Sequence, residues 1–66
     1  MEITNELEIR VLVTARKIRM FNESMAQQKA LGVTDEMLQS SIVMRDELER
    51  EFQRLSEQLR AATVAA

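Results

Sequence analysis

Carboxylates are the main side chains in this sequence that could carry out catalysis, because the chain contains no cysteine and no histidine. The densest group of acids lies in the second half of the chain and consists of Asp46, Glu47, Glu49 and Glu51. A catalytic carboxylate pair needs a shielded pocket. Here Arg50 and Arg54 follow three of these acids at spacings of three or four residues, which is typical of an exposed ion-pair surface on a helix. The acidic group therefore predicts a solvated helix face rather than a catalytic site.

The sequence also predicts no metal site, no cofactor site and no nucleophile. A di-metal helical bundle combines inward glutamates with Glu-x-x-His spacing, and a zinc–thiolate site needs cysteines. Both residue types that these sites require, histidine and cysteine, are absent. Ser40 and Ser41 lack a base that could activate a hydroxyl group. We therefore expect a protein that is not an enzyme and that binds no cofactor.

A basic cluster occupies the one charged stretch without acids, which runs over residues 9–22. Its members are Arg10, Arg16, Lys17 and Arg19. Such a cluster could bind phosphate, anionic lipid or an acidic partner, and it could equally pair with the acids of the second half. Because the whole chain has a net charge of −2, nucleic acid is disfavoured as a ligand, and a nucleic-acid-binding dimer is the weakest alternative.

A single glycine divides the chain into two long segments that contain neither glycine nor proline. Gly32 fits the residue that ends a helix in the left-handed conformation, and Thr34 fits the N-cap of a following helix. Asp35 and Glu36 would then complement the helix dipole in its first turn. The sequence predicts one domain over residues 1–66, with helices over about 3–31 and 34–61, a turn around Gly32–Val33 and a frayed tail over 62–66.

Residues at alternating spacings of three and four form one row in each segment, which is typical of helices that pack along one face. The row of the first segment consists of Leu7, Val11, Thr14, Ile18, Phe21, Met25 and Gln28. The row of the second consists of Leu38, Ser41, Arg45, Leu48, Phe52, Leu55, Leu59 and Ala62. The two rows come level when the chain folds back at Gly32, and together we call them the hairpin seam. They predict an all-α fold, an antiparallel two-helix hairpin.

A second set of apolar residues lies off the hairpin seam. In the first helix, Ile9, Val13 and Met20 recur on the opposite side, with Arg16 among them. The second helix offers Ile42, Val43 and Met44. Because a hairpin this small has a thin core and an exposed apolar face lowers solubility, we expect both sets to form an interface with another chain. The simplest arrangement is a homodimer that forms a four-helix bundle, and the alternative is a different protein partner.

The segment Gly32 to Leu38, together with Asp46, Leu48 and Phe52, resembles the second half of Spo0E-like aspartyl-phosphate phosphatases. Those phosphatases are small helical hairpins that dephosphorylate response regulators, and their signature is a Ser-Gln-Glu-Leu-Asp run on the second helix. At the matching place this chain has the run Ile42-Val43-Met44-Arg45-Asp46, which keeps only the aspartate. The resemblance implies, as an alternative to a binding module, a phosphatase with Asp46 as its key residue.

These observations favour a small non-enzymatic protein–protein interaction module, such as an adaptor, a regulator or a co-chaperone. No stretch approaches the ~18 apolar residues of a membrane span. Residues 1–10 lack the basic start and the apolar core of a signal peptide. We therefore expect a cytoplasmic protein without a membrane span.

Overall fold

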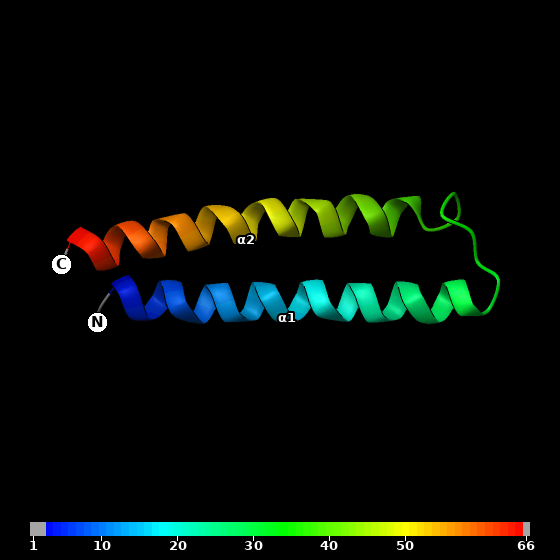
Figure 1. The fold of residues 1–66 in the computed structure, drawn as a ribbon, viewed down its shortest axis with the longest axis horizontal. Coiled ribbons are helices and arrows are strands. Elements are labelled where there is room, and N and C mark those ends of the chain that lie inside the picture. Colours follow the sequence, from blue (N-terminus) through cyan, green and yellow to red (C-terminus); the bar gives the residue numbers. More distant parts are fainter. Residues whose placement is uncertain (1–2, 66) are drawn as a thin grey trace.

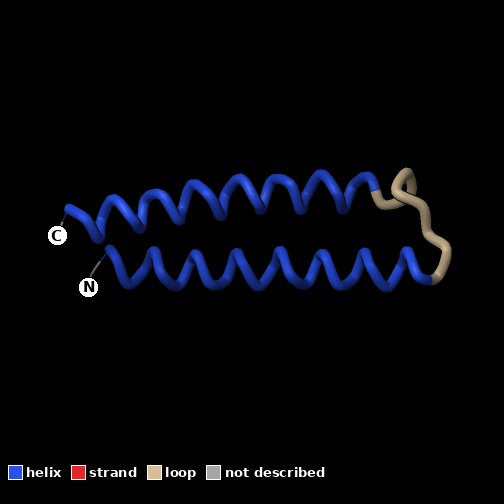
Figure 2. The backbone as a smooth tube through the Cα atoms, in the orientation of Figure 1, coloured by secondary structure: helices blue, strands red, loops and turns tan. Residues whose placement is uncertain are grey.

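Two long helices lie side by side and run in opposite directions (Figure 1). The structure is a computed structural model and describes residues 3–65. Helix α1 spans Ile3–Ala30 and helix α2 spans Gln39–Ala65, and together they form a rod of 49 × 15 × 14 Å. A short irregular segment joins them at one end of the rod (Figure 2). The predicted all-α hairpin is thus confirmed, and neither helix within residues 3–65 has a stretch long and apolar enough to cross a membrane.

Helix α1 ends at Ala30, and Gly32 terminates it in the conformation that its place in the sequence predicts. Gly32 has a φ of 96°, which lies in the left-handed region that glycine adopts without strain. Its N–H donates to the carbonyl of Lys29 at 3.0 Å, and the N–H of Val33 donates to the carbonyl of Gln28 at 3.0 Å. These two hydrogen bonds form a Schellman motif, which satisfies carbonyl groups that the helix leaves without partners.

Helix α2 begins at Gln39, five residues later than the predicted start at Thr34. Thr34 does open a helical turn, because its Oγ1 accepts a hydrogen bond from the N–H of Met37 at 3.4 Å. Its carbonyl also accepts a hydrogen bond from the N–H of Leu38 at 3.1 Å. The turn then tightens, since the N–H of Gln39 donates to the carbonyl of Glu36 at 3.4 Å, three residues back. The predicted cap is therefore present, but it caps a separate turn that precedes α2.

The two acids after Thr34 consequently lie outside the first turn of α2, contrary to prediction. Asp35 instead contacts the last turn of α1, where its Oδ1 lies 2.6 Å from Lys29 Nζ. Both side chains are largely exposed, so this ion pair contributes little to stability. It nevertheless bridges the two sides of the turn.

The structure also differs from the predicted frayed tail, because α2 continues to Ala65. Thr63 Oγ1 donates a hydrogen bond to the carbonyl of Leu59 at 2.8 Å, within the last turns of the helix. The segment is rich in alanine and contains no glycine or proline, so helix propensity favours its continuation. Of the predicted tail, Ala66 lies outside the described residues.

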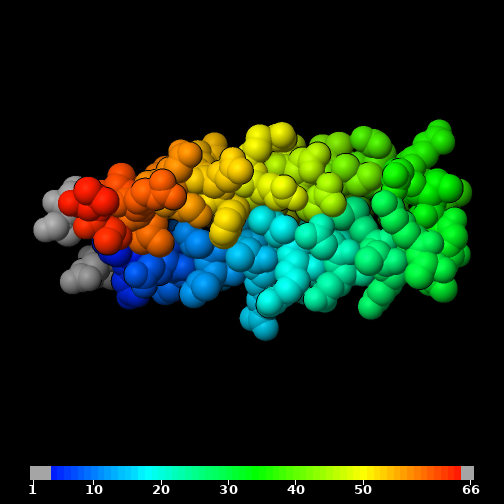
Figure 3. Space-filling view, viewed as in Figure 1, coloured from blue at the N-terminus to red at the C-terminus, as the bar shows by residue number. Residues whose placement is uncertain are grey.

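The hairpin seam forms the contact between the helices, which touch along their length (Figure 3). Its buried side chains are those of Leu7, Thr14, Met25, Leu38 and Leu55. The other seam residues are half-buried, except for Gln28, which is exposed. No large side chain of the described residues is fully buried. Two helices exclude water only from the row between them, so the core is thin.

Candidate protein interface

The side of α1 opposite the hairpin seam exposes several large apolar side chains. Ile9, Val13 and Met20 are 55%, 46% and 60% exposed, and Arg16 lies exposed among them. Their spacings of four, three and four residues place all four on one face of the helix. We call this row of Ile9, Val13, Arg16 and Met20 the outer stripe. Leu12 borders it and is 70% exposed.

The apolar residues predicted on the second helix do not form one surface. Val43 and Met44 are exposed, whereas Ile42 is half-buried and lines a hollow beside Met25. Consecutive helical residues point about 100° apart, so these three side chains face different directions. Helix α2 therefore adds no apolar stripe that matches the one on α1.

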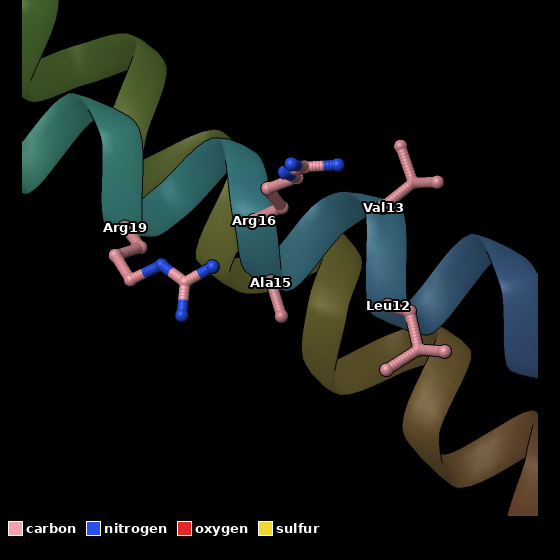
Figure 4. A pocket seen from close by; sticks show the side chains of 5 residues that line it. All are labelled: Leu12, Val13, Ala15, Arg16 and Arg19. Carbon is pink, nitrogen blue, oxygen red and sulfur yellow. The ribbon is translucent and has the colours of Figure 1, made fainter.

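Two shallow hollows lie beside Val13. The first is lined by α1 alone, with residues Leu12, Val13, Ala15, Arg16 and Arg19. Figure 4 shows Val13 and Arg16 on one side of α1, and Leu12, Ala15 and Arg19 on the other. The second hollow reaches toward α2 and is lined by Ile9, Arg10, Val13, Thr14, Lys17 and Glu51. Each contains four α1 residues at positions i, i+3, i+4 and i+7, the set that receives a side chain of a facing helix in a coiled coil.

The basic cluster does not pair with the acids of α2 as one of the predicted alternatives requires. Among residues 3–65, the ion pairs join Lys29 to Asp35 and Arg45 to Asp46 and Glu49, and none includes a residue of the basic cluster. All four members of the cluster are exposed: Arg10, Arg16, Lys17 and Arg19. Lys17 lines the same hollow as Glu51, but the two do not come within ion-pair distance. The charges of the cluster are therefore available to another molecule.

The acidic group of α2 is organised by Arg45, which lies half-buried in the hairpin seam. Arg45 Nη2 lies 3.3 Å from Asp46 Oδ1, and Nε lies 3.4 Å from Glu49 Oε1 without making a hydrogen bond. Arg45 Nη1 donates to Asn22 Oδ1 at 3.3 Å. Nothing in the sequence pattern singles out Asn22, because its contact depends on the register of the two helices. Asp46 thus takes part in an ion-pair surface.

A metal ion would need several ligands that converge on one point. Within residues 3–65, no three acidic side chains come together in this way. The four residues of the acidic group lie within six positions of one helix, so their carboxylates spread around its surface. The outer stripe and the basic cluster beside it remain the most distinctive surface of the hairpin.

Comparison of the chain with known protein families, with curated proteins and with solved structures finds no match. The resemblance to aspartyl-phosphate phosphatases thus rests on residues 32–38, which precede α2, and on Asp46, Leu48 and Phe52 alone. The function has to be argued from the surface of the hairpin.

Proposed function

We propose that this protein is a non-enzymatic protein–protein interaction module, an adaptor, regulator or co-chaperone, that binds through the outer stripe of α1. The observation that carries the proposal is the exposure of Ile9, Val13 and Met20 on one helix face, 46–60% for each side chain. Exposed apolar residues are common singly, but a row at coiled-coil spacing is the pattern that another helix covers.

The thin core of the hairpin supports the same proposal. Four apolar side chains are buried in the described residues: Leu7, Met25, Leu38 and Leu55. A chain of 66 residues gains little stability from so small a core. Any partner that binds the folded hairpin alone adds the free energy of binding to its stability. An additional helix on the outer stripe would therefore stabilise the fold as well as carry the function.

Two kinds of partner satisfy this proposal. A second copy could place its own helices against the first, which gives the dimeric four-helix bundle with closed two-fold symmetry. A helix of another protein could instead occupy the outer stripe, which is how many adaptors recognise amphipathic helices. Both share the requirement that Val13, at the centre of the stripe, becomes buried.

Site-specific photo-crosslinking in the producing cells tests this requirement. A photoreactive amino acid at Val13 should crosslink to protein, either another copy or a different chain. The control position is Glu57, which is exposed on α2 away from the outer stripe, and a probe there should crosslink far less. Equal crosslinking from both positions, or none from Val13, would contradict the proposal.

A further inference from the structure

The residues beside the outer stripe carry a charge pattern that identifies its partner more closely. In coiled-coil notation, Ile9 and Arg16 occupy d positions, and Val13 and Met20 occupy a positions. The flanking e and g positions are then Arg10, Leu12, Lys17 and Arg19. Three of these four are cationic and exposed, and none forms an ion pair within residues 3–65. The e and g residues determine which partner a coiled-coil helix accepts.

This pattern disfavours α1 of a second copy as the occupant. In an antiparallel pair, e residues face e residues and g residues face g residues, so that Arg10 and Lys17 would meet cations of the other copy. In a parallel pair, each g residue faces the e residue five positions further on, so Arg19 would face Ser24, but the two Arg16 side chains at the d position would face each other. Arg16 would add a further positive charge inside the contact. Like charges across a helix pair are destabilising, so the outer stripes of two copies do not favour pairing with each other.

Helix α2 of a second copy does not match the outer stripe either. Its outward face begins with Val43, which is 45% exposed, and ends with Ala61 and Val64, and the side chains between them at spacings of four and three are all charged. Those charged residues are Glu47, Arg50, Arg54 and Glu57. Such a face offers no continuous run of apolar residues that could cover Ile9, Val13 and Met20. It also brings arginines toward the basic cluster.

From this we infer that the outer stripe binds an acidic amphipathic helix of a different protein, an inference that rests on the proposed function. Apolar side chains of that helix pack against Ile9, Val13 and Met20. Its flanking carboxylates pair with the cations at the e and g positions, and one carboxylate reaches Arg16. Guanidinium groups suit this role because they are weakly hydrated and bind carboxylates through two parallel hydrogen bonds.

The hollows beside Val13 agree with such an occupant. The first has an apolar wall of Leu12 and Val13 and a cationic rim of Arg16 and Arg19. The second places Arg10 and Lys17 beside Ile9 and Val13, with one carboxylate, Glu51, on its α2 side. An acidic helix can place an apolar side chain against the wall and a carboxylate at the rim.

A nucleic acid would use the cations but would leave Ile9, Val13 and Met20 uncovered. An anionic membrane could use both kinds of residue, but it would place Arg16, which lies within the stripe, against lipid without a paired carboxylate.

Binding of designed peptides to the full chain tests this inference. The first peptide is a fluorescent helix of about three heptads with apolar a and d residues, glutamate at every e and g position and one glutamate at a central core position. The second is identical except for lysine in place of every glutamate. Fluorescence anisotropy should show that the acidic peptide binds at least about tenfold more tightly, the effect of three exposed ion pairs together. Its affinity should fall as salt is raised.

A charge-reversed variant makes the test specific to the outer stripe. Arg10→Glu, Lys17→Glu and Arg19→Glu, combined in one chain, should invert the preference so that the lysine peptide binds more tightly. The matched control carries Arg50→Glu, Arg54→Glu and Arg60→Glu on the exposed surface of α2. It changes the net charge equally and should keep the preference for the acidic peptide. Circular dichroism establishes that both variants remain helical.

Several results would overturn this inference while the proposed function stands. One is equal binding of the two peptides by the wild-type chain. Another is a dimer, detected by sedimentation, that Val13→Glu dissociates, since a second copy would then cover the stripe. Binding of phosphatidylserine vesicles or duplex DNA, lost in the α1 variant while neither peptide binds, would overturn the proposed function as well, because it would assign the surface to a membrane or a nucleic acid. No crosslinks from Val13, or equal crosslinking from Val13 and Glu57, would also contradict the proposed function.

Discussion

Arg45 of α2 reaches across the hairpin seam and donates a hydrogen bond from Nη1 to Oδ1 of Asn22 on α1, at 3.3 Å. Within residues 3–65 this is the one side-chain hydrogen bond that joins the two helices. The bond lies at the exposed edge of the seam, where water can replace either partner, so it favours this register of the helices only weakly. The same residue also contains the one buried polar atom without a hydrogen bond in this part of the chain, Nε.

We predict that Arg45→Met leaves the hairpin as stable as the wild type or stabilises it by about 1 kcal/mol, because a flexible apolar side chain fills the position and removes a buried donor without a partner. The ion pairs that would be lost are partly exposed and contribute little. Urea denaturation measures the change, with Arg54→Met as the control at an exposed position. A loss of more than about 1 kcal/mol would show that the bond to Asn22 outweighs the unsatisfied Nε.

The turn provides a second prediction, at Gly32. A Cβ atom at this position would meet nothing within 4 Å, so the only cost of Gly32→Ala is the positive φ of 96°. We expect a loss of about 1–2 kcal/mol in the free energy of unfolding. Because the chain is short enough for chemical synthesis, D-alanine at the same position is the matched control. It favours positive φ and should stabilise the hairpin by about 0.5–1 kcal/mol. Equal stabilities of the two variants would contradict the left-handed turn.

The sequence alone could predict the fold because several independent signals agree. Gly32 marks the turn. The rows that contain Leu7 and Leu55 each have helical spacing, and they come level when the chain folds back at Gly32. The burial of Leu7 and Leu55 confirms that both rows face the contact between the helices. The start of α2 could not be predicted in the same way. Thr34 has every feature of a helix cap, and only the tight bond from Gln39 to the carbonyl of Glu36 shows that its turn ends before α2 begins.

The candidate interface could be predicted in part. The exposure of Ile9, Val13 and Met20 follows from their position opposite the seam, since a hairpin has only one contact surface. Whether the basic cluster forms ion pairs with α2 could not be predicted from the sequence. Charges on two helices can line one hollow, as Lys17 and Glu51 do, and still not come within ion-pair distance, so only the geometry decides whether they pair. The partner lies outside this chain, so its acidic chemistry is inferred from the surface it must match.

The core provides a third prediction, because it depends on few side chains. Leu55 is 6% exposed and packs in the hairpin seam. Leu55→Ala should reduce the free energy of unfolding by about 2–5 kcal/mol, which includes the cost of the cavity it leaves. That loss is comparable to the whole stability of a small domain, so we expect the helical circular dichroism signal to collapse on mild heating.

Leu12→Ala is the matched control, with the same atoms removed from a side chain that is 70% exposed. It should change stability by less than about 0.5 kcal/mol. Similar losses for Leu55→Ala and Leu12→Ala would mean that the hairpin seam has been assigned to the wrong faces of the helices.

A last prediction separates the folding of the hairpin from its binding. Val13→Glu combined with Met20→Glu removes two exposed apolar side chains and places each new carboxylate four residues from a cation, Lys17 in one case and Arg16 in the other. Pairs at this spacing stabilise a helix by about 0.2–0.5 kcal/mol each, and glutamate favours helix more than valine does. The isolated hairpin should therefore keep or slightly increase its free energy of unfolding.

Binding of the acidic helix should be lost, because the carboxylates of the variant repel it and the apolar contact is gone. Val13→Thr with Met20→Gln is the uncharged control, and it should weaken binding less. A double glutamate variant that unfolds would show that these side chains support the hairpin itself, and one that still binds the acidic helix would place the interface elsewhere.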